Sequence, residues 1–88
     1  MSSRGTERFW RLYGALPLDV KATARAAFGR FRENPAHPNL HLERLRSDPR
    51  AWSVRVSRDC RAVALRHGDD WVWIWIGSHE NFDREFPV

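Results

Sequence analysis

The spacing of apolar residues changes near Asn34-Pro35, and this change constrains the fold of the chain more than any other feature. Upstream of it, apolar side chains recur with the period of a helix, and downstream they alternate with the two-residue period of a strand. Helices and strands in separate blocks are typical of an α+β domain. Since a chain of 88 residues suffices for one hydrophobic core, we expect residues 1–88 to form a single domain.

The first third of the chain is predicted to be a helical hairpin. Thr6 is a suitable N-cap for a short first helix, and Pro17 suits the first turn of a second helix. The second helix presents one apolar stripe at helical spacing, made of Val20, Ala24, Ala27, Phe28 and Phe31. We expect this stripe to pack against the sheet formed by the rest of the chain. No strand pattern is visible before Thr6.

The chain after Asn34 is predicted to form an antiparallel sheet of three or four strands. A short strand is expected within residues 40–45, and longer strands are expected at 52–57, 61–66 and 71–76. Turn residues separate the three longer strands, so they should follow one another as a meander.

The strand at residues 71–76 is apolar on both faces, as expected of a central strand that is covered on two sides. Regular alternation would place Trp71, Trp73 and Trp75 on one face and Val72, Ile74 and Ile76 on the other. We expect at least two of the three tryptophans to pack in the core. The few residues after His79 should add no more than one helical turn or a tail.

Charge and cysteine content bear on the partners and the compartment. Lys21 is the only lysine in a chain with 15 basic residues, 11 acidic residues and a formal net charge of +4. Arginine can contact a phosphate at two points, so this usage favours an anionic partner, although a GC-rich genome explains it equally well. Cys60 is the only cysteine, which excludes an internal disulfide, and we expect it to be a small buried hydrophobe. No apolar run approaches the length of a membrane span, and we expect a soluble cytoplasmic protein.

Two stretches of the second half carry the most informative motifs: Trp52-Ser-Val-Arg-Val-Ser-Arg-Asp-Cys-Arg-Ala-Val-Ala and Trp73-Ile-Trp-Ile-Gly-Ser-His-Glu-Asn-Phe-Asp. In their order and spacing they resemble the C-terminal core of the RelE/ParE-family toxins. Upstream, Phe9-Trp-Arg-Leu-Tyr, Leu16-Pro and Asn34-Pro-Ala-His-Pro-Asn-Leu resemble the helical hairpin of that family and the loop after it. The resemblance extends from about Phe9 to Phe82. It implies a helical hairpin packed on an antiparallel sheet.

The resemblance also implies a function, which is that of the toxin in a type II toxin–antitoxin pair with a cognate antitoxin as partner. The leading interpretation is a ribosome-associated endoribonuclease that cuts mRNA, inhibits translation, and needs no metal or other cofactor. Two alternatives stay open: a ParE-like toxin that poisons a topoisomerase, and an inactive homologue that only binds the antitoxin. Both are favoured by Cys60, where the family usually has an aromatic residue. Phe82 and Phe86 also favour them, because some members carry a functional tyrosine nearby.

The predicted catalytic residues are Arg61, His79 and Arg55. Arg55 and Arg61 are expected on adjacent strands, where both guanidinium groups could meet one phosphate and stabilise the charge that develops during cleavage. Arg61 shares its strand face with apolar Val63 and Leu65, so it requires a partner, either a carboxylate or a substrate phosphate. Arg55 could equally be a solvated strand residue. His79 follows the central strand and could transfer protons at neutral pH.

The remaining predicted site residues flank these three. Glu80, Asp83 and Phe82 are expected to support His79, and Arg44, Arg46 and Arg58 are predicted to contact RNA. The histidines outside the motif, which are His37, His41 and His67, are interpreted as loop and surface residues. We predict no metal site, because Pro38 prevents His37 and His41 from forming a metal-binding pair on a helix.

Overall fold

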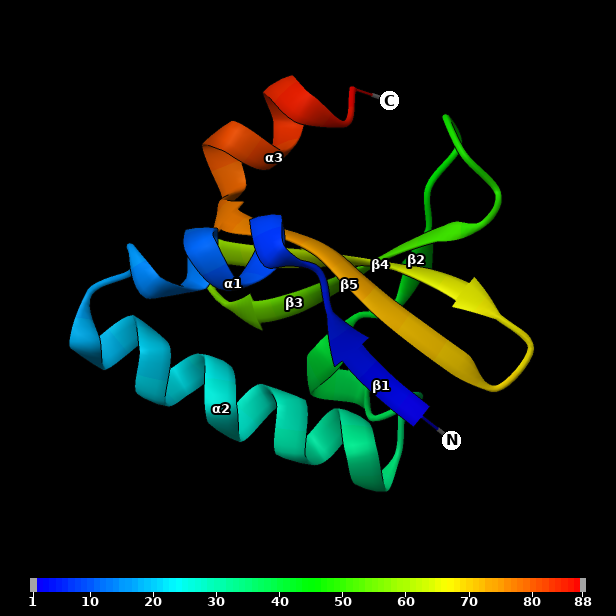
Figure 1. The fold of residues 1–88 in the computed structure, drawn as a ribbon, viewed down its shortest axis with the longest axis horizontal. Coiled ribbons are helices and arrows are strands. Elements are labelled where there is room, and N and C mark those ends of the chain that lie inside the picture. Colours follow the sequence, from blue (N-terminus) through cyan, green and yellow to red (C-terminus); the bar gives the residue numbers. More distant parts are fainter. Residues whose placement is uncertain (1, 88) are drawn as a thin grey trace.

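The computed structural model describes residues 2–87, in which two helices cover one face of a five-stranded sheet and a short third helix packs on the other (Figure 1). In chain order the elements are β1 (Ser2–Gly5), α1 (Glu7–Gly14), α2 (Leu18–Glu33), the 3-10 helix η1 (Pro38–Leu40), β2 (Glu43–Arg44), β3 (Ala51–Ser57), β4 (Cys60–His67), β5 (Asp70–Ser78) and α3 (His79–Glu85). The predicted α+β class is confirmed.

The helical hairpin forms where the sequence predicts it. Thr6 caps α1, since its Oγ1 accepts a hydrogen bond of 3.1 Å from the amide of Phe9. Pro17 is the N-cap of α2, one position before the expected first turn, and Asn34 ends that helix in an extended conformation. The predicted apolar stripe faces the sheet: Ala24, Ala27 and Phe31 are buried, and Val20 and Phe28 pack against the same cluster.

The sheet has the strand order β1-β5-β4-β3-β2, and its antiparallel meander of β3, β4 and β5 agrees with the prediction. β1 pairs in parallel with β5 and is absent from the sequence prediction. Its residues lie mostly exposed at the sheet edge and carry no apolar alternation, so nothing local marks them as a strand. Tertiary contacts hold β1 instead, including a hydrogen bond of 2.8 Å from Trp73 Nε1 to Ser3 Oγ.

Two further predictions about local structure are wrong in extent. The strand expected within residues 40–45 shrinks to the two residues of β2, because Leu40 belongs to η1 and is buried there. The helix after His79 is longer than one turn: α3 has seven residues. Ser78 caps α3 by accepting a hydrogen bond from the amide of Asn81, and apolar side chains of α3 pack on the sheet.

A β-bulge in β5 overturns the prediction that the three tryptophans share one face. Val63 is paired with Trp75 and the next residue, Ala64, with Trp73, so Ile74 is an extra residue in β5. Because of this extra residue, the side chains after Ile74 point to the sheet face opposite to the one that regular alternation would give them. Trp71 and Trp73 pack in the core under α1 and α2, whereas Trp75 joins the smaller core under α3. All three tryptophans are at least 96% buried, since none is more than 4% exposed.

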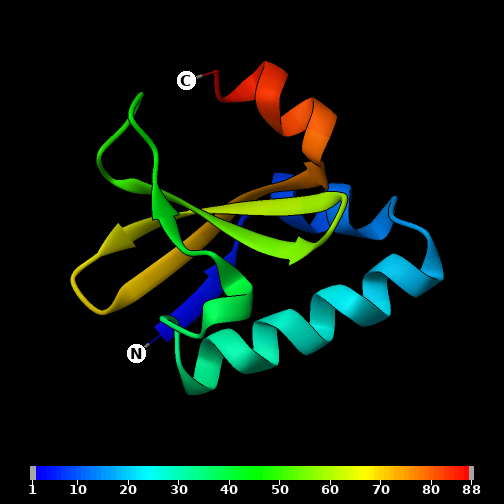
Figure 2. The ribbon, with the colours of Figure 1, turned by 180° about the vertical axis from the view of Figure 1, so that it is seen from behind.

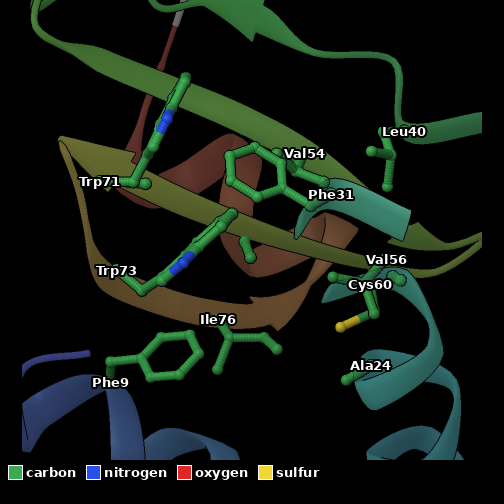
Figure 3. Packing of buried hydrophobic residues seen from close by; sticks show 13 residues of the cluster. Phe9, Ala24, Phe31, Leu40, Val54, Val56, Cys60, Trp71, Trp73 and Ile76 are labelled. Atoms are coloured by element: carbon green, nitrogen blue, oxygen red, sulfur yellow. The ribbon is translucent and has the colours of Figure 1, made fainter. Parts of the chain in front are cut away.

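Aromatic rings form the centre of the larger core, between α2 and the sheet (Figure 3). The ring of Phe31 meets Trp71 and Trp73 edge-on, with centroid distances of 4.9 and 5.0 Å. Phe31 is 1% exposed. It therefore fixes the end of α2 against both indoles of the central strand.

Replacing Phe31 with Ala is expected to destabilise the domain by about 3–5 kcal/mol, because it removes buried apolar surface and leaves a cavity beside the two indoles. Leu18→Ala is the matched control on the same helix: Leu18 is 82% exposed, and its loss should change stability by less than about 0.5 kcal/mol. Urea titration of both variants, followed by tryptophan fluorescence, measures the difference. Equal midpoints for the two variants would contradict this description of the core.

Candidate functional site

A groove of about 420 Å³ opens on the sheet face opposite α1 and α2, and α3 and the segment around β2 form its walls. Figure 2 shows α3 and the loop after β2 on the side of the sheet away from α2. The residues that the sequence predicts for the site and that line this groove are Arg44, Arg46, Arg61, His79 and Phe82. The structure thus gathers residues from β2, β4 and α3 that are far apart in the sequence.

Arg55 and Arg61 are direct cross-strand partners on β3 and β4, so their side chains leave the same face of the sheet. Arg61 Nη1 donates hydrogen bonds to the main-chain carbonyls of Ser57 and Cys60, at 3.0 and 3.2 Å. The internal partner that this arginine requires is therefore a pair of carbonyl oxygens and not a carboxylate. These bonds hold the guanidinium while other N–H groups of its five-donor fork can still meet a ligand.

His79 is the first residue of α3 and stands at the end of β5. Its main-chain amide donates a hydrogen bond of 2.8 Å to the carbonyl of Asp59, which ties the start of α3 to the β3–β4 turn. Its imidazole is half exposed and lies parallel to the ring of Phe82, and Nε2 is 3.8 Å from Asp83 Oδ1. This distance is too long for a hydrogen bond, so the predicted support of His79 by its neighbour Asp83 stays a prediction.

The other predicted site residues lie in different surroundings. Glu80 accepts a hydrogen bond of 3.1 Å from Arg84 on the outer side of α3, so its carboxylate is already engaged. Arg58 lies in the β3–β4 turn and borders a separate pocket near the start of α2. Arg44 borders the groove, but its guanidinium carbon lies 5.7 Å from the ring centroid of Trp52. A cation in this position stabilises the pairing of β2 with β3.

Sequence reasoning missed His41 and Glu43, which also line the groove. Glu43 is the cross-strand partner of Ser53 and so projects from the same face as Val63, the next residue in that row. His41 lies in a loop, as interpreted from the sequence, with a left-handed backbone at φ 45°. Local sequence offers no signal for either residue, because only the short pairing of β2 with β3 brings them to the site.

Gly77 lies directly opposite Arg61 on β5. A Cβ at this position would lie 2.8 Å from ring carbons of Trp75, so the indole of Trp75 passes over the backbone of Gly77. The rings of Phe82 and Phe86 pack on this indole, with centroid distances of 6.2 and 5.5 Å. No residue of α3 is fully buried, and this aromatic contact joins the helix to the sheet.

Cys60 behaves as a structural residue. It is 3% exposed, and burial raises the pKa of its thiol to about 11, which keeps it protonated at neutral pH. Within residues 2–87 no group of three or more potential metal ligands comes together. No helix in this part of the chain has the length and apolar character that crossing a membrane requires.

Residues 18–84 match the family model of the ParE-like toxin domain. The chain belongs to this family. No curated protein sequence matches the chain significantly. The match to this toxin family covers the second helix of the hairpin and the groove residues from β2 to α3, and it confirms the resemblance to RelE/ParE-family toxins that the motifs indicate.

Solved structures of toxins share the fold of this ParE-like domain. It is similar to the YoeB/ParE toxin from Agrobacterium tumefaciens, with a TM-score of 0.70 and 19% identity, over 90% of this chain and 99% of that chain. The RelB–RelE antitoxin–toxin complex from Methanococcus jannaschii has a TM-score of 0.70 and 13% identity, over 94% of this chain and 98% of that chain. YafQ from E. coli has a TM-score of 0.75 and 10% identity, over 92% of this chain and 96% of that chain. At these identities the likeness establishes a shared fold.

The raised pKa of Cys60 predicts a thiol that resists alkylation in the folded protein. Relative to an ordinary thiol, a pKa of about 11 leaves roughly 100-fold less thiolate at pH 8, before burial limits access further. We therefore expect iodoacetamide to react at least about 100-fold more slowly with the native protein than with the urea-unfolded chain. Mass spectrometry measures both rates. Rapid alkylation under native conditions would show that the β3–β4 end of the sheet opens readily.

Proposed function

We propose that this ParE-like domain is the toxin of a type II toxin–antitoxin pair and acts as a metal-independent endoribonuclease on mRNA at the ribosome. The observation that best supports cleavage is a single groove that holds His79 together with an Arg61 anchored by two main-chain carbonyls. A held cation and a proton-transfer group suit attack by a ribose 2′-hydroxyl on the neighbouring phosphate. Loss of mRNA in the cytoplasm would then arrest translation.

In the proposed reaction the 2′-hydroxyl loses its proton to a base, its oxygen attacks the phosphorus, and the 5′-oxygen leaves with a proton from an acid. Arg61, with Arg55 beside it, would stabilise the negative charge that grows on the non-bridging oxygens. Their cross-strand pairing suits two cations that meet one phosphate. His79 would carry one of the two protons, with its ring oriented by Asp83.

A second proton carrier and contacts to RNA come from the groove walls. His41 and Glu43 line the same groove as His79, and either side chain can accept a proton. Phe82 and Phe86 also line it, and aromatic rings in such a position can stack with a nucleobase. Arg46 extends the basic lining along the wall formed by the β2 segment, where it would contact a phosphate.

Arg61→Ala and His79→Ala are each expected to abolish growth arrest and to lower cleavage of mRNA on translating ribosomes by about 10²–10³-fold or more. This corresponds to a loss of roughly 3–5 kcal/mol of transition-state stabilisation. Arg55→Ala should have a weaker effect, because no main-chain acceptor fixes that guanidinium among residues 2–87. His67→Ala is the matched control, since His67 is exposed at the β4–β5 turn and does not line the groove.

Thermal melts of these variants separate catalysis from folding, because the loss of the Arg61 hydrogen bonds could loosen the β3–β4 turn. Unchanged cleavage by a folded His79→Ala protein would remove histidine from the mechanism. Full activity of a folded Arg61→Ala protein would remove the anchored guanidinium from the mechanism.

A second candidate function is binding and poisoning of a topoisomerase without any cleavage. The matching family model, which is that of the ParE-like toxin domain, favours it. The aromatic residues at the C-terminal end of the groove are phenylalanines, Phe82 and Phe86, which lack a hydroxyl that could act on a proton. A domain that has lost its activity and only binds an antitoxin would show the same two features.

Induced expression with metabolic labelling distinguishes these functions. If the domain cleaves mRNA, incorporation of labelled methionine is expected to fall first, with thymidine incorporation following later. His79→Ala serves as the control, because it should abolish the early fall. Arrest of thymidine incorporation while methionine incorporation continues would exclude the nuclease and support the topoisomerase. Normal incorporation of both labels would leave only antitoxin binding.

The partner that we propose is a cognate antitoxin. Similar folds have been solved as antitoxin–toxin complexes, including RelB–RelE from Methanococcus jannaschii and RelE–RelB from Pyrococcus horikoshii. A chain with a net charge of +4 and aromatic side chains at its surface offers the two kinds of contact that such a protein partner uses.

A further inference from the structure

We infer that the groove selects one base of its RNA and that this base is guanine, recognised by the carboxylate of Glu43 together with the hydroxyl of Ser53. The inference rests on the proposed function, and it names the nucleotide that the site prefers. The volume of the groove is about 420 Å³, which lies within the roughly 300–1,000 Å³ of typical small-molecule sites. The groove is therefore large enough to hold a nucleobase.

Glu43 is an acidic side chain in surroundings that are otherwise basic. Among the described residues that line the groove it is the only acid, whereas Arg44, Arg46 and Arg61 supply three cations. It is exposed and forms no ion pair within residues 2–87. An ionised carboxylate repels phosphates and can only accept hydrogen bonds. In a groove for RNA its best ligand is therefore a base that presents N–H groups.

Ser53 places a second polar group next to Glu43. The two residues are cross-strand partners on β2 and β3, which lie side by side (Figure 2), so their Cβ atoms lie roughly 4.5–5.5 Å apart on one face of the sheet. Ser53 is 7% exposed and is the only buried polar residue within the described range, 2–87. Because it also lines the groove, its hydroxyl stands at the floor, where it can donate a hydrogen bond.

These two side chains together match the Watson–Crick edge of guanine better than that of any other base. That edge carries two adjacent donors, which are N1–H and the N2 amino group, followed by the acceptor O6. The two carboxylate oxygens of Glu43 can accept from both donors, and the hydroxyl of Ser53 can donate to O6. Adenine, cytosine and uracil each present a single donor beside an acceptor, so one carboxylate oxygen would face a lone pair.

An aromatic wall stands across the groove from this pair. Ser53 pairs with Val63 of β4, and Val63 pairs with Trp75 of β5, so Ser53 and Trp75 are two strand spacings apart, about 9–10 Å. Phe82 and Phe86 pack on the indole of Trp75 and line the groove. A base that stacks on these rings can direct its edge toward Ser53. Stacking tolerates any base, so the choice among bases falls to the polar pair.

Binding of non-cleavable oligonucleotides to the full chain tests this assignment separately from catalysis. The probes are hexanucleotides of 2′-deoxyuridine, one unmodified and three that carry a single central guanine, adenine or cytosine. Without a 2′-hydroxyl they cannot undergo the proposed attack. NMR titration of the wild-type protein is expected to show affinity for the guanine probe about tenfold or more above that for the other three.

Glu43→Gln should reverse the preference between guanine and adenine, because the glutamine amide can donate to N1 of adenine and accept from its N6 amino group. Ser53→Ala should reduce the preference for guanine roughly threefold, since it removes only the bond to O6. Glu33→Gln is the matched control. It makes the same change as Glu43→Gln at an exposed residue of α2 that does not line the groove, so it should keep the wild-type preference.

Equal or undetectable affinity of the wild-type protein for all four probes would overturn the inference. A Glu43→Gln protein that keeps the wild-type preference for guanine would also overturn it, and Glu43 would then act on a proton instead. If guanosine 5′-monophosphate binds as tightly as the guanine probe, the base comes from a free nucleotide and not from RNA, which contradicts the inference as well.

The proposed nuclease activity is measured separately, by mapping cuts in mRNA on translating ribosomes, and these cuts are expected beside guanines. A protein that prefers the guanine probe and cleaves no mRNA would support guanine recognition and contradict the proposed function. Cuts without any preference for guanine, together with equal affinity for the four probes, would support the proposed function and overturn guanine recognition.

Discussion

The β-bulge at Ile74 is the constraint on which both faces of this domain depend. A regularly alternating β5 would direct all three of its tryptophans to the hairpin side, but the extra residue sends Trp75 to the other side. One face keeps two indoles for the main core, and the other gains the indole on which α3 rests. Phe82 and Phe86 of the C-terminal segment pack on that indole, so the packing of α3 against the sheet depends on this change of side.

The arginines of the chain fall into two groups, those that make structural contacts and those that have no ion-pair partner. Arg61 is held by main-chain carbonyls at the edge of a groove, which fixes a cation before any ligand arrives. Arg66 lies over the rings of Trp52 and Trp71. Each of these cation–π contacts stabilises the fold by roughly 0.5–1 kcal/mol. Arg25 and Arg32 have no ion-pair partner within residues 2–87. The 15 basic residues behind the net charge of +4 therefore include both structural and unpaired cations.

Most of the fold could be predicted because burial on one side of a helix or strand leaves a period in the sequence. The stripe that ends at Phe31 and the meander of β3 to β5 follow that rule. β1 and β2 do not, because their exposed residues carry no apolar alternation, and both strands form through contacts with other strands of the sheet. The bulge at Ile74 was equally invisible, since an apolar run has no alternation for an extra residue to interrupt.

By itself the sequence determined the family and the helical hairpin, because these depend on patterns that are local, and it predicted Arg61 and His79 as site residues from their place in the motif. The tertiary structure alone decided which side chains meet. It brought Arg46 to the groove, directed Arg44 to Trp52, separated Arg58 from the others, and added Glu43. The reason is physical: the face of a residue on an edge strand depends on pairing with a distant strand, and that pairing leaves no trace in the neighbouring residues.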